Sequence, residues 1–314
     1  MKTLSYYFLR SFYTKYSLLK KIYNYDEVPK EILVNCPACD GENLNDFNNI
    51  DRYGFNVHTS WCASCGLIFV NPRINLEYYN KLYMDGSYRK IIEAVSLKKQ
   101  KSLDTIPQRL TLVLSKISEI YKDKEINILD IGGTAGIYNY LNENLTIKKY
   151  LCINPGADEA DIGTTTNVEV VNTTIEEYHA TDEKYDLIIL FGTISHLMNP
   201  YDAFLKSKLL LKSDGLFVLD FKDNLTRMKA VNLPFTQLHF DHPIYFSKGS
   251  LETLVTNVGL EVWDYITYKN GVSYYFLSNN KNVIDVKSVN SQVSEVALLA
   301  EHIQEVDARK IIFE

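Results

Sequence analysis

The sequence lacks the features that mark membrane-spanning, fibrous and disordered proteins. None of its apolar runs reaches 18 residues, so no membrane-spanning helix is expected. Internal repeats and low-complexity tracts are also missing. Charged residues make up 23% and hydrophobic residues 46% of the chain, which is normal for a globular protein. At roughly 150 residues per domain, the 314 residues predict about two domains.

The chain also lacks the basic surplus that most nucleic-acid-binding proteins carry. Its 33 Lys and Arg residues are outnumbered by 39 Asp and Glu residues, which gives a formal net charge of −6. Proteins that bind a phosphate backbone usually need an excess of positive charge. The composition therefore argues against nucleic acid as a partner and leaves only a local basic patch open.

The first residues lack the uninterrupted apolar stretch of a signal peptide, which needs roughly 7–15 residues. Arg10 and Lys15 interrupt the apolar residues, and the first 25 residues carry five basic residues and no acidic one. This pattern is typical of a basic amphipathic helix, which we expect within residues 1–30. Such a helix can pack on its own domain, or it can contact a membrane surface or a partner. Both interpretations stay open, and we expect no other membrane contact.

Five cysteines are too few for a disulfide scaffold in a chain of this length, and four of them form two Cys-x-x-Cys pairs. Cys36 pairs with Cys39 and Cys62 with Cys65, and 22 residues separate the pairs. Four thiolates match tetrahedral zinc and leave no open coordination position. We therefore expect a structural zinc module over residues 31–73, in a reducing compartment, the cytoplasm. The alternatives are two unrelated thiol pairs or a redox pair.

From residue 123 onward, apolar runs of strand length alternate with helical patterns, which predicts a doubly wound α/β sheet. Two β-rich runs joined by Asn270-Gly271 predict a closing antiparallel hairpin. Residues 74–122 show helical periodicity, and residues 281–314 predict a C-terminal helix. The expected strands cover residues 126–131, 148–154, 168–172, 185–191 and 216–221 and the hairpin 260–279, with a helix over 199–215.

A glycine-rich turn follows the first of these strands and opens a helix. It comprises Asp130, Gly132, Gly133, Thr134 and Gly136. Glycines let the backbone approach a ligand, and a helix N-terminus offers free N–H groups, so the turn is typical of a nucleotide-type cofactor loop. A dinucleotide fold needs Gly-x-Gly-x-x-Gly and a P-loop needs Gly-Lys-Ser/Thr. Neither pattern is present, which argues against both cofactor classes.

With this turn, the sequence resembles the class I S-adenosylmethionine-dependent methyltransferases from roughly Asp123 to Asn279. In that family an acid ends the first strand, and Asp-x-Gly-x-x-x-Gly wraps the methionine end of the cofactor. Asp130, Gly132 and Gly136 match this pattern. The most specific match is LIILFGTISHLMNPYDAFLKSKLLLKSDGLFVLDF. The resemblance implies a Rossmann-like seven-stranded sheet over residues 123–280 that ends in an antiparallel hairpin.

One branch of this family also carries Cys-x-x-Cys pairs just upstream, and many of its members methylate nucleotide-linked sugars or other small molecules. The segment QLHFDHPIYFS (237–247) is similar to the Tyr-His-Glu-His…Tyr-Phe-Ser element of the sugar C-methyltransferases. The resemblance implies a nucleotide-linked sugar or a glycan precursor as the methyl acceptor. No Asn/Asp-Pro-Pro-aromatic element follows the fourth strand, which argues against methylation of bases or of glutamine amides.

The resemblance also implies which residues hold the cofactor, S-adenosylmethionine. Asn154 stands where the family usually has the acid that grips the ribose hydroxyls. Thr173 or Thr174 stands where an acid often meets adenine, and Phe191 and Gly192 begin the segment where adenine would lie. The full predicted set is Asp130, Gly132, Gly133, Thr134, Gly136, Asn154, Thr173, Phe191 and Gly192.

Candidate catalytic residues follow two strands whose carboxyl ends lie at the ligand-binding edge of an α/β sheet. His196 comes after the fourth strand, and His239, Asp241 and His242 come after the fifth. Histidine suits proton transfer because its pKa lies near neutrality, and a carboxylate can orient it or raise its pKa. We expect these four residues to deprotonate the acceptor during in-line methyl transfer.

Other candidates receive weaker assignments. Tyr83 and Tyr88 lie before the α/β region and either close over the acceptor or pack as helix residues. His58, His179 and His302 are expected to have no catalytic role. The sequence favours a small-molecule methyltransferase, and two alternatives stay open: an RNA methyltransferase whose zinc ribbon grips RNA, and an inactive zinc-bearing interaction protein. The position of the transferred methyl group and the oligomeric state also stay open.

Overall fold

The computed structural model describes residues 17–95, 108–156, 166–179, 182–231, 233–268, 271–279 and 289–305. Its largest element is a seven-stranded sheet with the order β12-β13-β10-β9-β6-β7-β8. The strands from β10 to β8 are parallel, and β13 pairs antiparallel with β10 and with β12. The strands are β6 (Glu125–Ile131), β7 (Thr146–Ile153), β8 (Val168–Val171), β9 (Tyr185–Leu190), β10 (Leu211–Lys222), β12 (Glu261–Thr267) and β13 (Val272–Ser278).

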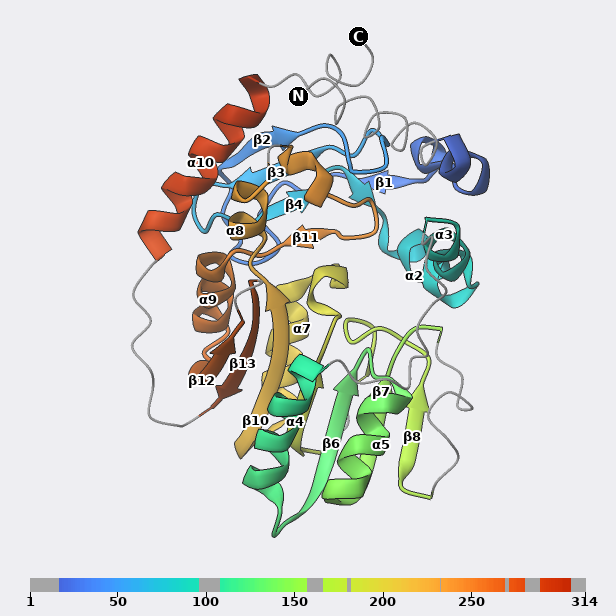
Figure 1. The fold of residues 1–314 in the computed structure, drawn as a ribbon, viewed down its shortest axis with the longest axis vertical. Helices are drawn as coiled ribbons and strands as arrows, with labels where there is room; N and C mark the ends of the chain where they lie inside the picture. The colour runs from blue at the N-terminus through green and yellow to red at the C-terminus, as the bar shows by residue number, and fades with distance from the viewer. Residues whose placement is uncertain are drawn as a thin grey trace.

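Helices cover both faces of this sheet (Figure 1). α4 (Gln108–Tyr121) and α5 (Ala135–Asn144) lie on one face, and α7 (Pro200–Leu210) and α9 (Lys248–Asn257) lie on the other. Ile128 of β6 belongs to the core under α4 and α5, and the next residue, Leu129, belongs to the core under α7 and α9. Successive side chains of a strand point to opposite faces, so a continuous apolar run fills both cores. The predicted doubly wound α/β fold with a closing antiparallel hairpin is confirmed; Asn270 of the predicted turn lies outside the described residues.

The expected helix over 199–215 is too long. α7 ends at Leu210, and β10 begins at Leu211, which pairs with Tyr185 of β9. Gly215 lies within β10, where an added Cβ would approach the carbonyl oxygen of Asp186 to 2.9 Å. This glycine therefore permits a close approach of two backbones and does not close the helix.

A second, four-stranded sheet has the order β11-β4-β3-β2 and lies above the carboxyl end of β6 in Figure 1. Strands β2, β3 and β4 come from residues 31–73, the cysteine-rich region. Strand β11 comes from the chain after β10 and pairs antiparallel with β4. The sheet thus joins residues from both sides of the expected boundary at residue 73. The strands are β2 (Leu44–Asn48), β3 (Thr59–Cys62), β4 (Ile68–Val70) and β11 (Ile244–Tyr245), and β1 (Lys30–Glu31) pairs separately with β5 (Arg73–Ile74).

The remaining helices surround the space between the two sheets. Among them, α10 (Val289–Glu305) contacts β2 and α9, so the predicted C-terminal helix covers the cysteine-rich sheet. The others are η1 (Tyr25–Glu27), α2 (Leu76–Met84), α3 (Ser87–Val95), η2 (Ile194–His196), α8 (Asn224–Lys229) and η3 (Pro234–Gln237).

The predicted amphipathic helix of residues 1–30 lies mostly outside the described residues. Residues 17–22 are helical, and Leu19 among them is fully buried. Within the described parts of the chain, no helix combines the length and apolarity that crossing a membrane requires.

Candidate active site

The glycine-rich turn connects β6 to α5 at the carboxyl edge of the large sheet. Gly132 has a φ of +77° and donates its N–H to the carbonyl oxygen of Ile153 at 2.7 Å. An added Cβ at Gly132 would approach Thr193 Oγ1 to 2.1 Å. Both the conformation and the space therefore require glycine. α5 begins at Ala135, directly after this turn, and its first N–H groups have no partner within the helix.

The carboxyl group of Asp130 packs against this turn. Its side chain is buried, and Tyr150 donates a hydrogen bond to Asp130 Oδ2. Burial raises the pKa of Asp130 to about 7, and the Tyr150 hydroxyl opposes this rise. Asp130 Oδ2 would also lie only 2.4 Å from an added Cβ at Gly133, so the carboxyl group sits against the turn. Tyr150 could not be singled out from the sequence, because it lies within an ordinary strand pattern.

The first cavity lies beside the turn and has a volume of about 130 Å³. Gly132 and Asn154 line it, and Asn154 Nδ2 donates to the carbonyl oxygen of Gly133 at 3.0 Å. Thr174 and Thr193 also line this cavity. The other lining residues are Tyr79, Asn80, Tyr83, Ile131, Ile153, Pro155, Ile175, Glu176, His196 and Leu197.

Several predicted cofactor residues lie near this cavity without lining it. Thr134 caps α5, and Gly136 is buried in the first turn of that helix. Thr173 donates its N–H to the carbonyl oxygen of Val171, next to the lining residue Thr174. Phe191 is buried with its ring edge against Tyr274, at a centroid distance of 5.8 Å.

The four predicted catalytic residues meet in one cluster. The rings of His196 and His242 are perpendicular with centroids 4.7 Å apart, and the rings of His239 and His242 are stacked at 4.5 Å. Asp241 is buried, and its two oxygens lie 3.8 Å from His239 Nδ1 and from His242 Nε2. The carbonyl oxygen of Asp241 lies 3.2 Å from His196 Nδ1. The structure thus brings together residues that are more than 40 positions apart in the sequence.

Two tyrosines of α2 complete this cluster. The hydroxyl of Tyr83 lies 2.7 Å from His196 Nδ1, and Tyr79 donates its hydroxyl to the carbonyl oxygen of Asp241 at 3.0 Å. Tyr88 presents its ring edge to His196 at a centroid distance of 6.1 Å. Tyr83 and Tyr88 were candidates from the sequence, whereas Tyr79 was not. The spacing of four residues between Tyr79 and Tyr83, which places both on one helix face, could have indicated it.

Burial keeps the imidazoles of the cluster uncharged. Burial, aided by the neighbouring His242, lowers the pKa of His196 to about 3. Burial likewise lowers the pKa of His242 to about 3, and Lys222, Arg52 and Arg227 add to this effect. The pKa of Asp241 rises because burial disfavours its charged form. Neutral imidazoles at ordinary pH are the form that can accept a proton.

The second cavity lies on the other side of the segment 192–196 and has a volume of about 160 Å³. His239 and His242 line it, and three basic residues lie on its wall. Gly192 also lines this cavity, and its N–H donates to Asp220 Oδ1 at 2.5 Å. The basic residues are Arg52, Lys222 and Arg227, and the other lining residues are Ile194, Ser195, Asp220, Phe221, Asn224, Gln237, Ile244 and Phe246. The sequence analysis missed the three basic residues because they are isolated in the sequence.

The four cysteines of the two Cys-x-x-Cys pairs converge in the cysteine-rich region. Cys36 Sγ lies 3.7 Å from Cys65 Sγ, and Cys39 Sγ lies 3.6 Å from Cys62 Sγ. All four thiols are free, and their sulfur atoms lie within 4.8 Å of one another. Four sulfurs at 2.3 Å from one zinc ion would be separated by about 3.8 Å. The cluster therefore has the dimensions that a tetrahedral metal site requires.

Comparison with known proteins identifies the family. Residues 101–265, more than half of the chain, match the family model described as methyltransferase domain. The chain belongs to this methyltransferase family. The match covers the turn after β6 and the residues from β6 to η2 that line the first cavity. It also covers β9 and β10, the strands that precede the histidine cluster. The protein is therefore an S-adenosylmethionine-dependent methyltransferase, as the resemblance of its sequence implied. No curated protein matched the methyltransferase.

The chain is also similar, at low sequence identity, to solved structures of other methyltransferases. The plantazolicin methyltransferase BpumL in complex with SAH is 13% identical, with a TM-score of 0.47, and the match covers 64% of this chain and 94% of that one. A Leishmania major SAM-dependent methyltransferase is 14% identical, with a TM-score of 0.44 and coverage of 65% and 81%. The N-methyltransferase NodS from Bradyrhizobium japonicum WM9 is 15% identical, with a TM-score of 0.42 and coverage of 55% and 96%.

The residues of the first cavity fit S-adenosylmethionine. The glycine turn brings the backbone to the cavity, and the N-terminus of α5 offers N–H groups beside it. Asn154 commits its amide nitrogen to Gly133, which leaves its oxygen as an acceptor for a ribose hydroxyl. An acid at this position would offer two acceptor oxygens, so Asn154 would make fewer hydrogen bonds to a bound ribose than an acid would.

Proposed function

We propose that the methyltransferase methylates a nucleotide-linked sugar or a glycan precursor, and that the histidine cluster removes a proton from this acceptor. One observation carries the proposal: the first cavity and the second cavity meet at the histidine cluster. His196 lines the first cavity, and His242, 4.7 Å away between ring centroids, lines the second. A donor in the first cavity and an acceptor in the second would therefore meet beside two imidazoles.

In this proposal the first cavity holds the methyl donor. The amides after β6 and at the start of α5 would bind its methionine part, and Asn154 would bind its ribose. Bound S-adenosylmethionine would supply a methyl group through in-line displacement from its sulfonium. The rigid turn contributes by holding the donor in place, because orientation alone supplies several kcal/mol of barrier reduction.

His242 is the proposed base. Its side chain keeps 22% exposure and lines the second cavity, whereas Asp241 beside it is almost fully buried. The acceptor's proton moves to the neutral imidazole of His242, and the electron pair left on the acceptor attacks the methyl group. Asp241 Oδ2, at 3.8 Å from His242 Nε2, stabilises the imidazolium that forms. The Tyr83 hydroxyl, 2.7 Å from His196 Nδ1, holds the neighbouring ring in position.

The cysteine cluster is proposed to hold a structural zinc ion. The support is the number of thiols, their separations of 3.6 and 3.7 Å, and the closed shell that four sulfurs make. Because a closed shell leaves no position for substrate, the zinc would stabilise the cysteine-rich sheet and take no part in methyl transfer.

The test of the proposed function is the variant His242→Ala. We expect its kcat to fall by about 100-fold or more, the usual contribution of a general base, with unchanged affinity for S-adenosylhomocysteine in calorimetry. The assay follows formation of S-adenosylhomocysteine with a panel of nucleotide-linked sugars. The matched control is His179→Ala, because His179 is exposed and lines neither cavity. Full turnover in His242→Ala would remove His242 from the mechanism, and the absence of any heat with S-adenosylhomocysteine would refute the donor site.

A further inference from the structure

Two guanidinium groups on the wall of the second cavity are hydrogen-bonded to neutral side chains. Arg52 Nη1 lies 2.9 Å from His239 Nε2, and Arg227 Nη2 donates to Gln237 Oε1 at 3.1 Å. Among the residues that the structure describes, no acidic side chain forms an ion pair with Arg52 or with Arg227. Asp220, the acid of this wall, is oriented by the N–H of Gly192.

The positive charges act on one another and on the histidines. Burial and the nearby Arg52 both lower the pKa of Arg227, although the guanidinium stays charged. Lys222 and Arg52 also contribute to the lowered pKa of His239, after burial and the influence of His242. Like charges held together in a cavity create a positive potential that attracts an anion. Three basic side chains face one acidic side chain, Asp220, on this wall, so its net charge is positive, as an anion site requires.

Arg52 reaches this cavity from the cysteine-rich region. It lies in the loop between β2 and β3, and its backbone N–H donates a hydrogen bond to the carbonyl oxygen of Leu238 at 3.0 Å. The preceding residue, Asp51, is fully buried and accepts the N–H of Phe240 at 3.1 Å. Asp51 also accepts the N–H groups of Tyr53 and Phe55. These bonds fix the loop against the segment that carries His239 and His242, so Arg52 is held at the cavity by the backbone beside it.

We propose that Arg52 and Arg227 bind a phosphate group of the methyl acceptor in the second cavity. The inference rests on the proposed function, because it takes this cavity as the acceptor site. A guanidinium offers a planar set of N–H donors that matches phosphate oxygens two at a time. The cavity's volume of about 160 Å³ equals the liquid volume of about five water molecules, which leaves room for a phosphate or diphosphate beside the histidines. Lys222, on the same wall, adds a third positive charge.

The experiment measures binding of uridine diphosphate to the full chain by calorimetry, with uridine as the uncharged comparison. We expect uridine diphosphate to bind and uridine to bind far more weakly. Arg52→Gln and Arg227→Gln should each lower the affinity for uridine diphosphate by about tenfold to hundredfold, because each removes charge-assisted hydrogen bonds. Arg52→Lys, which keeps the charge and loses the planar donor set, should show a smaller loss. Rising salt should weaken binding to the wild type more than to the two glutamine variants.

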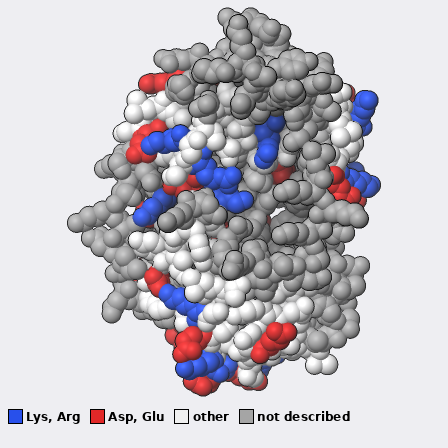
Figure 2. All heavy atoms as spheres, viewed as in Figure 1, with Lys and Arg blue, Asp and Glu red and all other residues white. Residues whose placement is uncertain are grey.

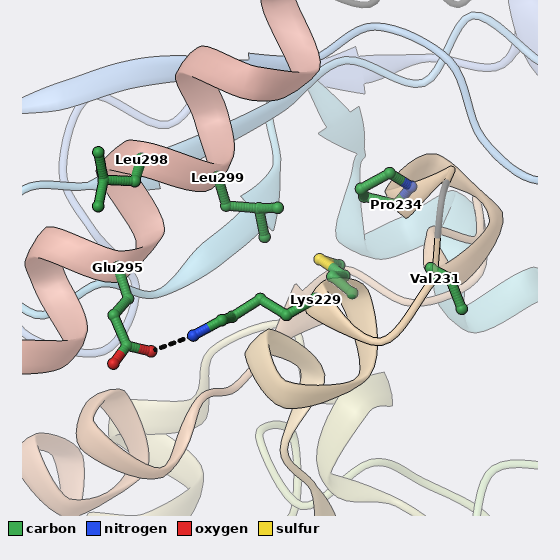
Figure 3. A pocket seen from close by; sticks show the side chains of 7 residues that line it. Lys229, Val231, Pro234, Glu295, Leu298 and Leu299 are labelled. Atoms are coloured by element: carbon green, nitrogen blue, oxygen red, sulfur yellow. Dashed lines mark hydrogen bonds and ion pairs between the residues drawn. The ribbon is translucent and has the colours of Figure 1, made fainter.

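The matched control is Lys229→Gln. Lys229 lies on α8, two residues after Arg227, but its ammonium group points to Glu295 of α10 at 3.0 Å (Figure 3). This variant removes the same charge from the same helix and should leave the affinity for uridine diphosphate unchanged. Thermal unfolding of each variant checks that its fold is kept.

Three results would overturn the inference: no heat from uridine diphosphate, unchanged affinity in both arginine variants, or an equal loss in Lys229→Gln. Calorimetry with S-adenosylhomocysteine on the same samples separates this inference from the proposed function. Binding of S-adenosylhomocysteine without uridine diphosphate would reject the phosphate site and keep the donor site. Binding of uridine diphosphate that depends on Arg52, without S-adenosylhomocysteine, would keep the anion site and reject the proposed function.

Discussion

Gly132 shows how a single residue sets the geometry of the turn beside the first cavity. A few other residue types could adopt its positive φ at a cost in energy. No side chain fits at this position, however, because a Cβ would collide with Thr193 Oγ1. The sequence predicted the turn from its glycines and its place after a strand. It could not predict Thr193 as the neighbour, because that contact joins the segments after β6 and β9, two strands that are adjacent only in the folded sheet.

Gly132→Ala should therefore cost more than the conformation alone explains. The control is Gly86→Ala, since Gly86 has a similar φ of +73° but open space around an added Cβ. Gly86→Ala should lose about 1–2 kcal/mol of stability, the cost of the left-handed conformation. Gly132→Ala should lose more and should lower the affinity for S-adenosylhomocysteine by at least about tenfold. Equal behaviour of the two variants in urea unfolding and calorimetry would show that the contact with Thr193 is unimportant.

The pH dependence of turnover reports the state of the buried histidines. A base whose pKa is lowered stays free of protons until the pH falls below the lowered value. Because burial lowers the pKa values of His196 and His242 to about 3, both rings stay neutral through the range where free histidine titrates, near pH 6.5. We expect kcat/KM to show no loss between pH 7 and about pH 5 from these groups. A decline centred near pH 6.5 would mean that the active imidazole is solvated.

At the scale of elements, the sequence predicted the strands of the large sheet and missed the short strands outside it, such as β11. β6 and β9 are buried runs of six or seven residues, and their pattern alone identified them. β11 has two residues, Ile244 and Tyr245, and its partner β4 lies more than 170 positions earlier. No local pattern distinguishes such a strand from a loop. The same reason hid Arg52, whose partner His239 is 187 positions away.

Removal of the zinc ion proposed for the cysteine cluster should affect the two cavities differently. The loop with Asp51 and Arg52 connects β2 to β3, and Cys62 is the last residue of β3. Chelation should release about one zinc ion per chain and weaken binding of uridine diphosphate. Binding of S-adenosylhomocysteine should persist, because the turn after β6 makes no use of the cysteine cluster. Metal analysis and calorimetry before and after chelation test this prediction, and a metal-free preparation with four reactive thiols and undiminished phosphate binding would contradict it.

At the scale of the whole molecule, the two cavities divide between the two sheets. The first cavity belongs mainly to the large sheet, whereas the second cavity takes Arg52 from the cysteine-rich region and its histidines from the segment before β11. The net charge of −6 gave no hint of this, because a total says nothing about placement. Figure 2 shows basic and acidic side chains interspersed on one face, with basic ones over the area where α8 lies in Figure 1. A small basic cavity is compatible with an acidic protein.

Because β11 completes the four-stranded sheet, that sheet cannot be finished early in protein synthesis. A ribosome releases the cysteine-rich segment early, yet the last strand of that sheet emerges only with residue 245. Domains usually fold in the order in which they are made, but here the first-made part has to wait for the later one with an open strand edge, β4. A chaperone or an early metal ion would be most useful during this interval, and N-terminal fragments produced alone should tend to aggregate.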